Sequence, residues 1–584
     1  MAVIKNDTIY NSTKGTPLFL ICLLFPLVSV FAQKSSVKKP NVIVILTDDM
    51  GYSDIGCFGS EIKTPNIDKL AKKGLSFTHF YNTARCSPTR ASLLTGLYPH
   101  QAGMGHLATE NYKEAGYADD LSKNAVTMAE VFQSAGYATY MTGKWHIAKN
   151  LGRTTDSSNW PCQRGFQRYF GTLNGSGSYY DPGTLISNNK FIAPPTKDFY
   201  YTNAISDTAV KFIRENPNGK PFFFYMAYTA AHWPLQAPES EIKKYKGQYD
   251  KGWDYIREQR FNKLKKLGII SANCVLTERG VTIPAWNDEP MKEWQAKRME
   301  VYAAMIDIMD QGIGRIITAL EQKGELENTV IFYMHDNGGC AEPLDSNVPE
   351  VPLTSEQKVV KPYSYDSIFL DKKPLYTRDG NFVRSGKGVM PGPANTFTAY
   401  GEEWANVSNT PFRLYKHWVH EGGIASPLII HWPKGIAAKG KLSNQPSHLI
   451  DVMATCIDIA QLNYPKEYHQ NLIQPFEGKS LKPAFANKPI ERAFIFWEHE
   501  GNRAIRVANW KLVSRTKKNK AFSTEDEAAW ELYNMDTDPT EIKNLAKIYP
   551  DKVIELAKLW EKEAQRTSAK PWPWNNKKQS KNQE

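Results

Sequence analysis

Two short clusters of acidic and amide side chains could hold a metal ion. Asp48 and Asp49 are adjacent, and Asp336 and Asn337 are adjacent much later in the chain. Together they offer three carboxylates and an amide oxygen, an all-oxygen set that suits a hard cation and favours Ca²⁺ over Mg²⁺. Taken singly, an Asp-Asp pair is most often a helix cap or a turn, and Asp-Asn-Gly-Gly is most often a hairpin. The position of the clusters along the chain favours the metal site.

Both clusters come at the ends of segments that we predict to be buried strands. Asn41–Thr47 (NVIVILT) is a continuous apolar, β-branched run, which is typical of a strand buried on both faces. Similar runs recur at 137–142, 221–228, 329–334 and 427–431, and helical patterns occur at 125–134, 202–215 and 291–323. This alternation predicts an α/β fold with a mostly parallel sheet covered by helices. Ligands of such sheets bind at the carboxyl ends of strands, where both clusters lie.

A third motif lies between the two clusters. Residues 86–96 read CSPTRASLLTG and resemble the signature of the type I sulfatases, in which a maturation enzyme reads Cys-x-Pro-x-Arg and oxidises the cysteine to formylglycine. Formylglycine hydrates to a geminal diol. One hydroxyl can take the sulfuryl group, and deprotonation of the other expels sulfate without attack of water on sulfur. A buried or disulfide-bonded cysteine beside a proline turn is the alternative, but the length of the match favours the sulfatase motif.

The resemblance implies the metal site and the base. The modified Cys86 would contribute an oxygen to the metal, beside the four ligands named above, and the ion would polarise a sulfate oxygen. Arg90 would brace the modified residue with a guanidinium that cannot lose its charge. Lys144, in the GKWH motif, would contact sulfate and the diol, and His146 would take the proton of the second hydroxyl. A lone lysine or histidine is otherwise a solvated charge or a buried structural imidazole.

Two further residues could serve the departing oxygen of the substrate. His232, in the AHWP motif, matches a family histidine that contacts sulfate near the leaving oxygen. Lys416, shortly before a Glu-Gly-Gly motif, matches the spacing of the family's second active-site lysine. Either could protonate or stabilise the departing alkoxide, and the sequence does not rank them. His417 and His420 follow Lys416 in the same segment and are interpreted as structural.

The composition indicates an exported globular protein. The chain has 584 residues, of which 41% are hydrophobic, enough for a large core and two domains. Residues 1–32 combine an early positive charge with an apolar run, which predicts a secretory signal peptide rather than a membrane anchor. We therefore expect a secreted or periplasmic protein with no integral membrane segment after signal cleavage. A net charge of +11 suits an anionic partner, and no nucleic-acid-binding motif accompanies it.

A change to short, closely spaced strand-like runs predicts a second, smaller domain near the C-terminus. Short strand-like runs at 493–497, 504–507, 511–514 and 532–534 precede a helical pattern at 552–566, which indicates an antiparallel sheet with one helix. The run LYNMDTDPTEIKNLA resembles the closing motif of sulfatase C-terminal domains. The predicted organisation is a signal peptide (1–32), a catalytic sulfatase domain (33–486), a C-terminal α+β subdomain (487–576) and a basic tail (577–584).

One turn of the predicted C-terminal sheet carries a histidine and an arginine. We expect His499 and Arg503 to reach the mouth of the site and to bind the non-reacting part of the substrate, because arginine can hold sulfate or carboxylate groups with two hydrogen bonds. A solvated hairpin with incidental salt bridges is the alternative. The polar stretches 239–290 and 341–405 are predicted to be long insertions around the same mouth.

The resemblance extends over residues 39–546, and residues 399–427 resemble the bacterial arylsulfatase subgroup in particular. It implies an alkaline-phosphatase-like fold and a secreted sulfatase with one Ca²⁺ per chain and a formylglycine made from Cys86 by a formylglycine-generating maturation enzyme. Sulfated small molecules, oligosaccharides or polysaccharides are the expected substrates, with aryl sulfates as surrogates. Two alternatives are a phosphonate or phosphate monoester hydrolase of the same superfamily and a non-catalytic sulfated-glycan-binding protein. The base and the two lysines argue against the latter, because a binding protein needs no base.

Overall fold

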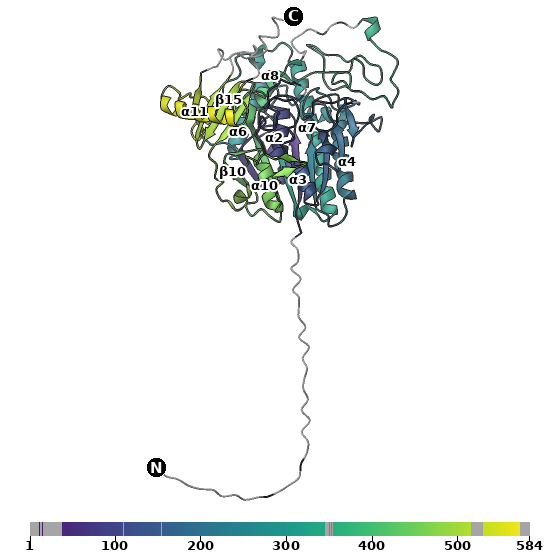
Figure 1. Cartoon of the computed structure of the whole chain (residues 1–584). Coiled ribbons are helices and arrows are strands. Elements are labelled where there is room, and N and C mark those ends of the chain that lie inside the picture. Colours follow the sequence, from purple (N-terminus) through teal and green to yellow (C-terminus); the bar gives the residue numbers. More distant parts are fainter. Residues whose placement is uncertain are drawn as a thin grey trace, which may run out of the picture. The chain divides into compact units, whose positions relative to one another are not determined.

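The computed structural model is built on a mixed, mostly parallel sheet of eleven strands around β1 (Asn41–Thr47). Strand β1 pairs in parallel with β7 (Phe222–Ala227) on one side and with β8 (Thr329–His335) on the other. Strand β9 (Ala425–His431) runs antiparallel to β8. Helices cover the sheet, as Figure 1 shows, and all seven residues of β1 are buried. The predicted fold class is therefore confirmed.

The sheet has the strand order β10-β2-β9-β8-β1-β7-β3-β4-β5-β6, with β11 paired to β2. Its other strands are β2 (Leu75–Tyr81), β3 (Ala138–Lys144), β4 (Arg168–Thr172), β5 (Leu185–Ser187), β6 (Lys190–Phe191), β10 (Lys441–Ser443) and β11 (Ser447–His448). Strands β12 (Glu467–Tyr468) and β13 (Asn471–Leu472) form a separate ribbon. The α-helices are α1 (Pro65–Lys73), α2 (Cys86–Thr95), α3 (Met128–Ser134), α4 (Tyr201–Glu215), α5 (Glu239–Ile242), α6 (Gly252–Lys266), α7 (Lys292–Gln322), α8 (Gly401–Ser408), α9 (Glu421–Ile424), α10 (Asp451–Ala460) and α11 (Pro550–Arg566).

The structure describes residues 38–108, 110–153, 155–344, 350, 352, 354–515 and 529–572, together with residues 11 and 15. The predicted signal peptide, apart from residues 11 and 15, and the predicted basic tail lie outside the described residues. The described residues from Lys39 onward form one compact unit. No helix among the described residues combines the length and the apolar character that crossing a membrane requires.

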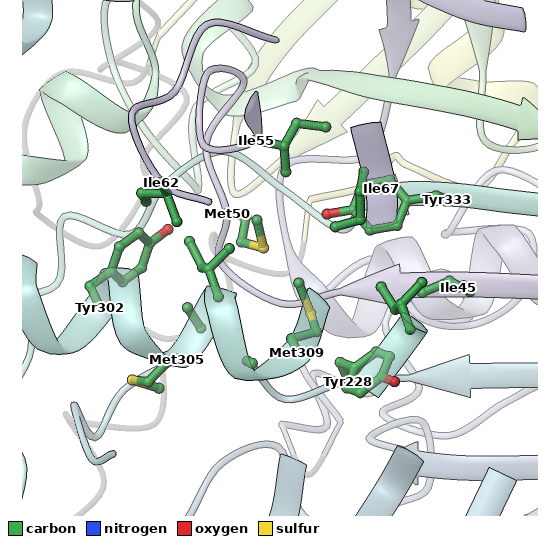
Figure 2. Packing of buried hydrophobic residues seen from close by; sticks show 14 of the residues in the cluster. Ile45, Met50, Ile55, Ile62, Ile67, Tyr228, Tyr302, Met305, Met309 and Tyr333 are labelled. Atoms are coloured by element: carbon green, nitrogen blue, oxygen red, sulfur yellow. The ribbon is translucent and has the colours of Figure 1, made fainter. Parts of the chain in front are cut away.

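The core lies on both faces of the sheet, because the side chains of β1 alternate between two hydrophobic clusters. Ile43 and Ile45 belong to the cluster that contains the long helix α7, and Val44 belongs to the cluster that contains α2 and α3. Figure 2 shows Met305 and Met309 of α7 together with Ile45 and Met50 in the first of these clusters. This burial on two faces explains why the strand sequence is apolar throughout.

The C-terminal part forms the antiparallel sheet that the sequence predicts. Strands β14 (Ile495–His499), β15 (Asn502–Val507), β16 (Trp510–Ser514) and β17 (Glu531–Asn534) pair in sequence order. Helix α11 packs against this sheet, beside β15 in Figure 1. Side chains of this sheet join the same two hydrophobic clusters as the main sheet.

The stretch 239–290 differs from the predicted insertion because much of it is helical. Helix α6 has no continuous apolar stripe, which is why the periodicity of the sequence did not indicate it. It packs against α7 and α8 and buries the guanidinium of Arg260. That group pairs with Asp54 at 2.6 Å and with both carboxylate oxygens of Glu61 at 2.8 Å.

Asp54 connects this helix to the loop that follows β1. Its carboxylate accepts hydrogen bonds from the backbone N–H of Gly51 and from the hydroxyl of Tyr302 in α7, both at 2.8 Å. The Tyr302 hydroxyl also lies 3.1 Å from the backbone oxygen of Asp49. Helix α6 therefore braces the backbone that carries the first pair of candidate metal ligands.

We predict that Arg260→Ala lowers the free energy of unfolding by about 3–5 kcal/mol, because it leaves the buried carboxylate of Asp54 without its partner. Urea unfolding measures this loss. The matched control is Arg315→Ala, which removes an exposed ion pair with Asp207 and should cost about 1 kcal/mol or less. Equal losses in the two variants would contradict a bracing role for Arg260.

Candidate active site

The two predicted metal clusters lie side by side at one edge of the sheet. Strands β1 and β8 are parallel neighbours with Thr47 opposite His335, so the residues that follow them meet at the same level. The backbone N–H of Asp49 donates to Asp336 Oδ1 at 3.1 Å, and Asn337 Nδ2 donates to Asp49 Oδ1 at 2.8 Å. These side chains are almost completely buried. Asp49 has a φ of +58°, a left-handed conformation that the surrounding contacts must hold.

The oxygens of this cluster fit a hard cation. Among the described residues, Asp48 Oδ1 and Asn337 Oδ1 are buried without a hydrogen-bond partner, which is costly unless a ligand satisfies them. Burial and the nearby carboxylate of Asp48 raise the pKa of Asp336 well above its usual value. A divalent cation would relieve both the unsatisfied oxygens and the repulsion between carboxylates.

Cys86 is the first residue of α2, and the same helix brings Arg90 to the acidic cluster. The Arg90 guanidinium lies 3.1 Å from Asp336 Oδ2 and 3.5 Å from Asp48 Oδ2, and it donates to the backbone oxygen of Lys144 at 3.1 Å. The thiol of Cys86 is buried and interacts electrostatically with Arg90 and Lys416.

Strand β3 and the residues after it bring Lys144 and His146 to the same edge. Lys144 Nζ donates to Asp48 Oδ2 at 2.6 Å. His146 follows with a φ of +56°, and its Nδ1 has no hydrogen-bond partner among the described residues. Burial first, and then the charges of Lys144 and Arg90, lower the pKa of His146 well below its usual value. A neutral imidazole with a free ring nitrogen can accept a proton.

His232 and Lys416 both lie against Asp49. His232 Nε2 is 3.3 Å from Asp49 Oδ2, and Lys416 Nζ is 2.9 and 3.0 Å from the two carboxylate oxygens. His232 Nδ1 lies 2.7 Å from the backbone oxygen of Trp233, so Nδ1 carries the hydrogen of the neutral ring. Burial disfavours the charge of Lys416, but Asp49 outweighs it and raises the pKa of the lysine.

The segment that carries Lys416 packs closely against the backbone after β8, and this close packing requires glycine. A Cβ at Gly338 would lie 1.9 Å from the backbone oxygen of Gly422, and the Gly338 N–H donates to the oxygen of Gly423 at 2.9 Å. The two glycine-containing motifs therefore pack backbone against backbone. This contact joins the end of β8 to the segment that carries Lys416.

The sequence did not indicate two charged residues beside the site, Arg85 and Glu342. They form an ion pair at 3.1 Å, and Trp233 Nε1 donates to Glu342 at 3.0 Å. Lys416 lowers the pKa of Glu342, and Lys416 Nζ also lies 3.9 Å from the thiol of Cys340. No motif marks Glu342, because its partners come from distant parts of the chain. Its position shows that the stretch 341–405 contacts the site.

His499 and Arg503, on the two strands that flank the C-terminal turn, have different surroundings. His499 is buried beside His417 and Glu500. Arg503 is also buried and lies 4.2 Å from the ring centroid of Trp530, with Trp560 and Trp572 within 6 Å and a hydrogen bond to Ser514. The described contacts of Arg503 therefore give its predicted role in substrate binding no support.

Known families match nearly all of the described chain. The family described as Sulfatase matches residues 40–462, and the family described as N-sulphoglucosamine sulphohydrolase, C-terminal, matches residues 412–568. The first match spans the two acidic clusters, Cys86, His146 and Lys416.

Individual proteins show the same similarity. An arylsulfatase of Klebsiella aerogenes is 35% identical over 465 residues, which cover 77% of this chain and 93% of the relative. An uncharacterized sulfatase of Schizosaccharomyces pombe is 35% identical over 560 residues, 91% of this chain and 94% of the relative. A protein solved in complex with its substrate D-glucosamine-2-N,6-O-disulfate has a TM-score of 0.56 at 20% identity, covering 92% of this chain and 100% of that chain. The chain therefore belongs to the sulfatase family and is a sulfuric ester hydrolase.

Proposed function

We propose that this sulfatase uses Cys86, converted to formylglycine by a maturation enzyme, as its nucleophile, and that one Ca²⁺ is bound by Asp48, Asp49, Asp336, Asn337 and the modified residue. The observation that carries the proposal is the position of Cys86. It lies at the buried N-terminus of α2 and interacts with Arg90 and Lys416, which in turn contact the acidic cluster. When bound, Ca²⁺ would polarise a sulfate oxygen, and the diol at position 86 would supply both the attacking hydroxyl and the hydroxyl that later expels sulfate.

The remaining residues bind the sulfate group and move protons. Arg90 fixes the position of α2 against the acidic cluster through its contact with Asp336. The ammonium group of Lys144 lies on Asp48, where it can also donate to a sulfate oxygen or to the diol. His146 offers a ring nitrogen as the base for the second hydroxyl of the diol.

We assign to Lys416 the role of donating a proton to the departing oxygen of the substrate. Its ammonium group has three N–H donors beside Asp49, whereas neutral His232 keeps its hydrogen on Nδ1 and presents only a lone pair at Nε2. Lys416 can therefore donate without first gaining a proton.

Sulfated carbohydrate is the substrate class that we propose, and export is the proposed localisation. A structurally similar protein binds a sulfated glucosamine, and the net charge of +11 would attract an anionic glycan. The N-terminal sequence supports secretion or transfer to the periplasm.

The modification gives a mass that can be measured. In protein produced together with a maturation enzyme, the peptide that contains Cys86 should be about 18 Da lighter than the unmodified peptide, the change from thiol to aldehyde. Cys86→Ala should abolish turnover of an aryl sulfate and keep the fold, as judged by circular dichroism. The control, Cys162→Ala, changes a thiol outside the site and should remain active. Turnover by Cys86→Ala would refute the proposed nucleophile.

Removal of the metal should abolish activity. A chelator should inactivate the enzyme, and added Ca²⁺ should restore it better than Mg²⁺. Asp336→Asn should reduce kcat/KM at least about 100-fold, because charge stabilisation of several kcal/mol is lost. Asp207→Asn, at an exposed carboxylate, is the control and should be unaffected. Full activity of the chelated enzyme would exclude a catalytic metal.

The role of Lys416 can be tested with aryl sulfates whose phenols differ in pKa. A proton donor matters more when the leaving oxygen is more basic. We expect the loss of kcat/KM in Lys416→Ala to grow with the pKa of the phenol and the loss in His232→Ala to stay constant. The assignment fails if Lys416→Ala loses the same factor with every substrate.

A further inference from the structure

Histidines from three separate segments surround the carboxylate of Glu500, in the turn between β14 and β15. His417 Nδ1 lies 2.5 Å from Glu500 Oε2, and His106 Nε2 lies 2.7 Å from Oε1. His499 Nε2 lies 3.5 Å from Oε1. Ring contacts join the group, since His499 stacks on His106 with centroids 5.8 Å apart and meets His417 edge to face at 5.6 Å.

His499 is the unusual member of this group. Its side chain is about 1% exposed, and neither ring nitrogen has a hydrogen-bond partner among the described residues. The 3.5 Å contact with Glu500 is too long for a normal hydrogen bond. A buried imidazole with two unsatisfied nitrogens carries a free-energy cost that a ligand at Nε2 would remove.

Imidazole nitrogen and carboxylate oxygen are the ligands that zinc binds in proteins. Around a tetrahedral Zn²⁺ with bonds of about 2.1 Å, neighbouring ligand atoms are about 3.4 Å apart. One ligand atom each from His417, His499 and Glu500 lies within 4.8 Å of the others. The Glu500–His499 pair is already at 3.5 Å, and the Glu500–His417 pair, now a hydrogen bond of 2.5 Å, would lengthen when the ion replaces the shared proton. We propose that these three residues bind a zinc ion and that His106 holds the Glu500 carboxylate from outside through its hydrogen bond.

The surroundings also suit a metal site. The side chain of His417 is 25% exposed, which gives an ion access from solvent, while Glu500 and His499 lie deeper. With three protein ligands, one coordination position remains for water or another oxygen.

This site is separate from the proposed calcium site but lies next to the active-site segments. His417 follows Lys416 directly, and its backbone N–H donates to the oxygen of Ala84 at 2.8 Å, two residues before Cys86. Glu500 also interacts electrostatically with Arg85. A zinc ion here would link the β14–β15 turn to the segments that carry the nucleophile and Lys416. We expect it to restrict the motion of this turn relative to the active site.

Zinc binding can be measured independently of catalysis. Protein in Ca²⁺ buffer is treated with a chelator selective for zinc and is then titrated with Zn²⁺. We expect one zinc per chain with a dissociation constant below about 1 µM, and a rise of the melting temperature with zinc. Cys86→Ala should bind zinc equally well, so the result does not depend on the proposed nucleophile. Wild-type protein that binds no zinc would overturn the proposal.

Variants test the ligands. His499→Gln and His417→Gln should each weaken zinc binding at least about 100-fold, while His469→Gln, at an exposed histidine, should bind as the wild type does. Unchanged zinc affinity in His499→Gln would overturn the assignment. If the variants fail to fold, X-ray absorption spectroscopy at the zinc edge of the wild-type protein identifies the ligands of the ion. Two imidazoles and one carboxylate are expected, and any other set of protein ligands would contradict the site.

Discussion

The candidate active site depends on the balance of charge among three buried carboxylates. Asp48, Asp49 and Asp336 lie at the carboxyl ends of β1 and β8, where water cannot screen their repulsion. Arg90, Lys144 and Lys416 each contact one or two of them, at distances between 2.6 and 3.5 Å. Three positive and three negative side chains balance. The charge of a bound divalent cation would therefore remain available for the sulfate ester and the ionised nucleophile.

The surrounding helices and strands hold these charged side chains in position. Helix α2 carries Arg90, β3 ends at Lys144, and the contact between Gly338 and Gly422 fixes the segment of Lys416. The loop after β1 is held by Asp54, which pairs with Arg260 of α6 and accepts a hydrogen bond from Tyr302 of α7. Each support comes from a different part of the chain, so the charges assemble only when the whole sheet has formed.

The sequence allowed much of this arrangement to be predicted, because strands buried on two faces are apolar throughout. The run NVIVILT has the bounds of β1, and the acidic clusters follow β1 and β8 as expected. Helix α6 was missed because it has no apolar stripe, and its stabilising group is a buried arginine. Glu342 and the three tryptophans around Arg503 could not be foreseen, because those contacts join residues far apart in the sequence.

The most direct test of the proposed metal site is a crystal structure from crystals grown with Ca²⁺, in which the anomalous signal of the metal is measured. The proposed site predicts a calcium peak within about 2.3–2.6 Å of oxygens from Asp48, Asp49, Asp336 and Asn337. A calcium peak elsewhere, with these four oxygens sharing no ion, would contradict the central claim that the buried carboxylates form one metal site.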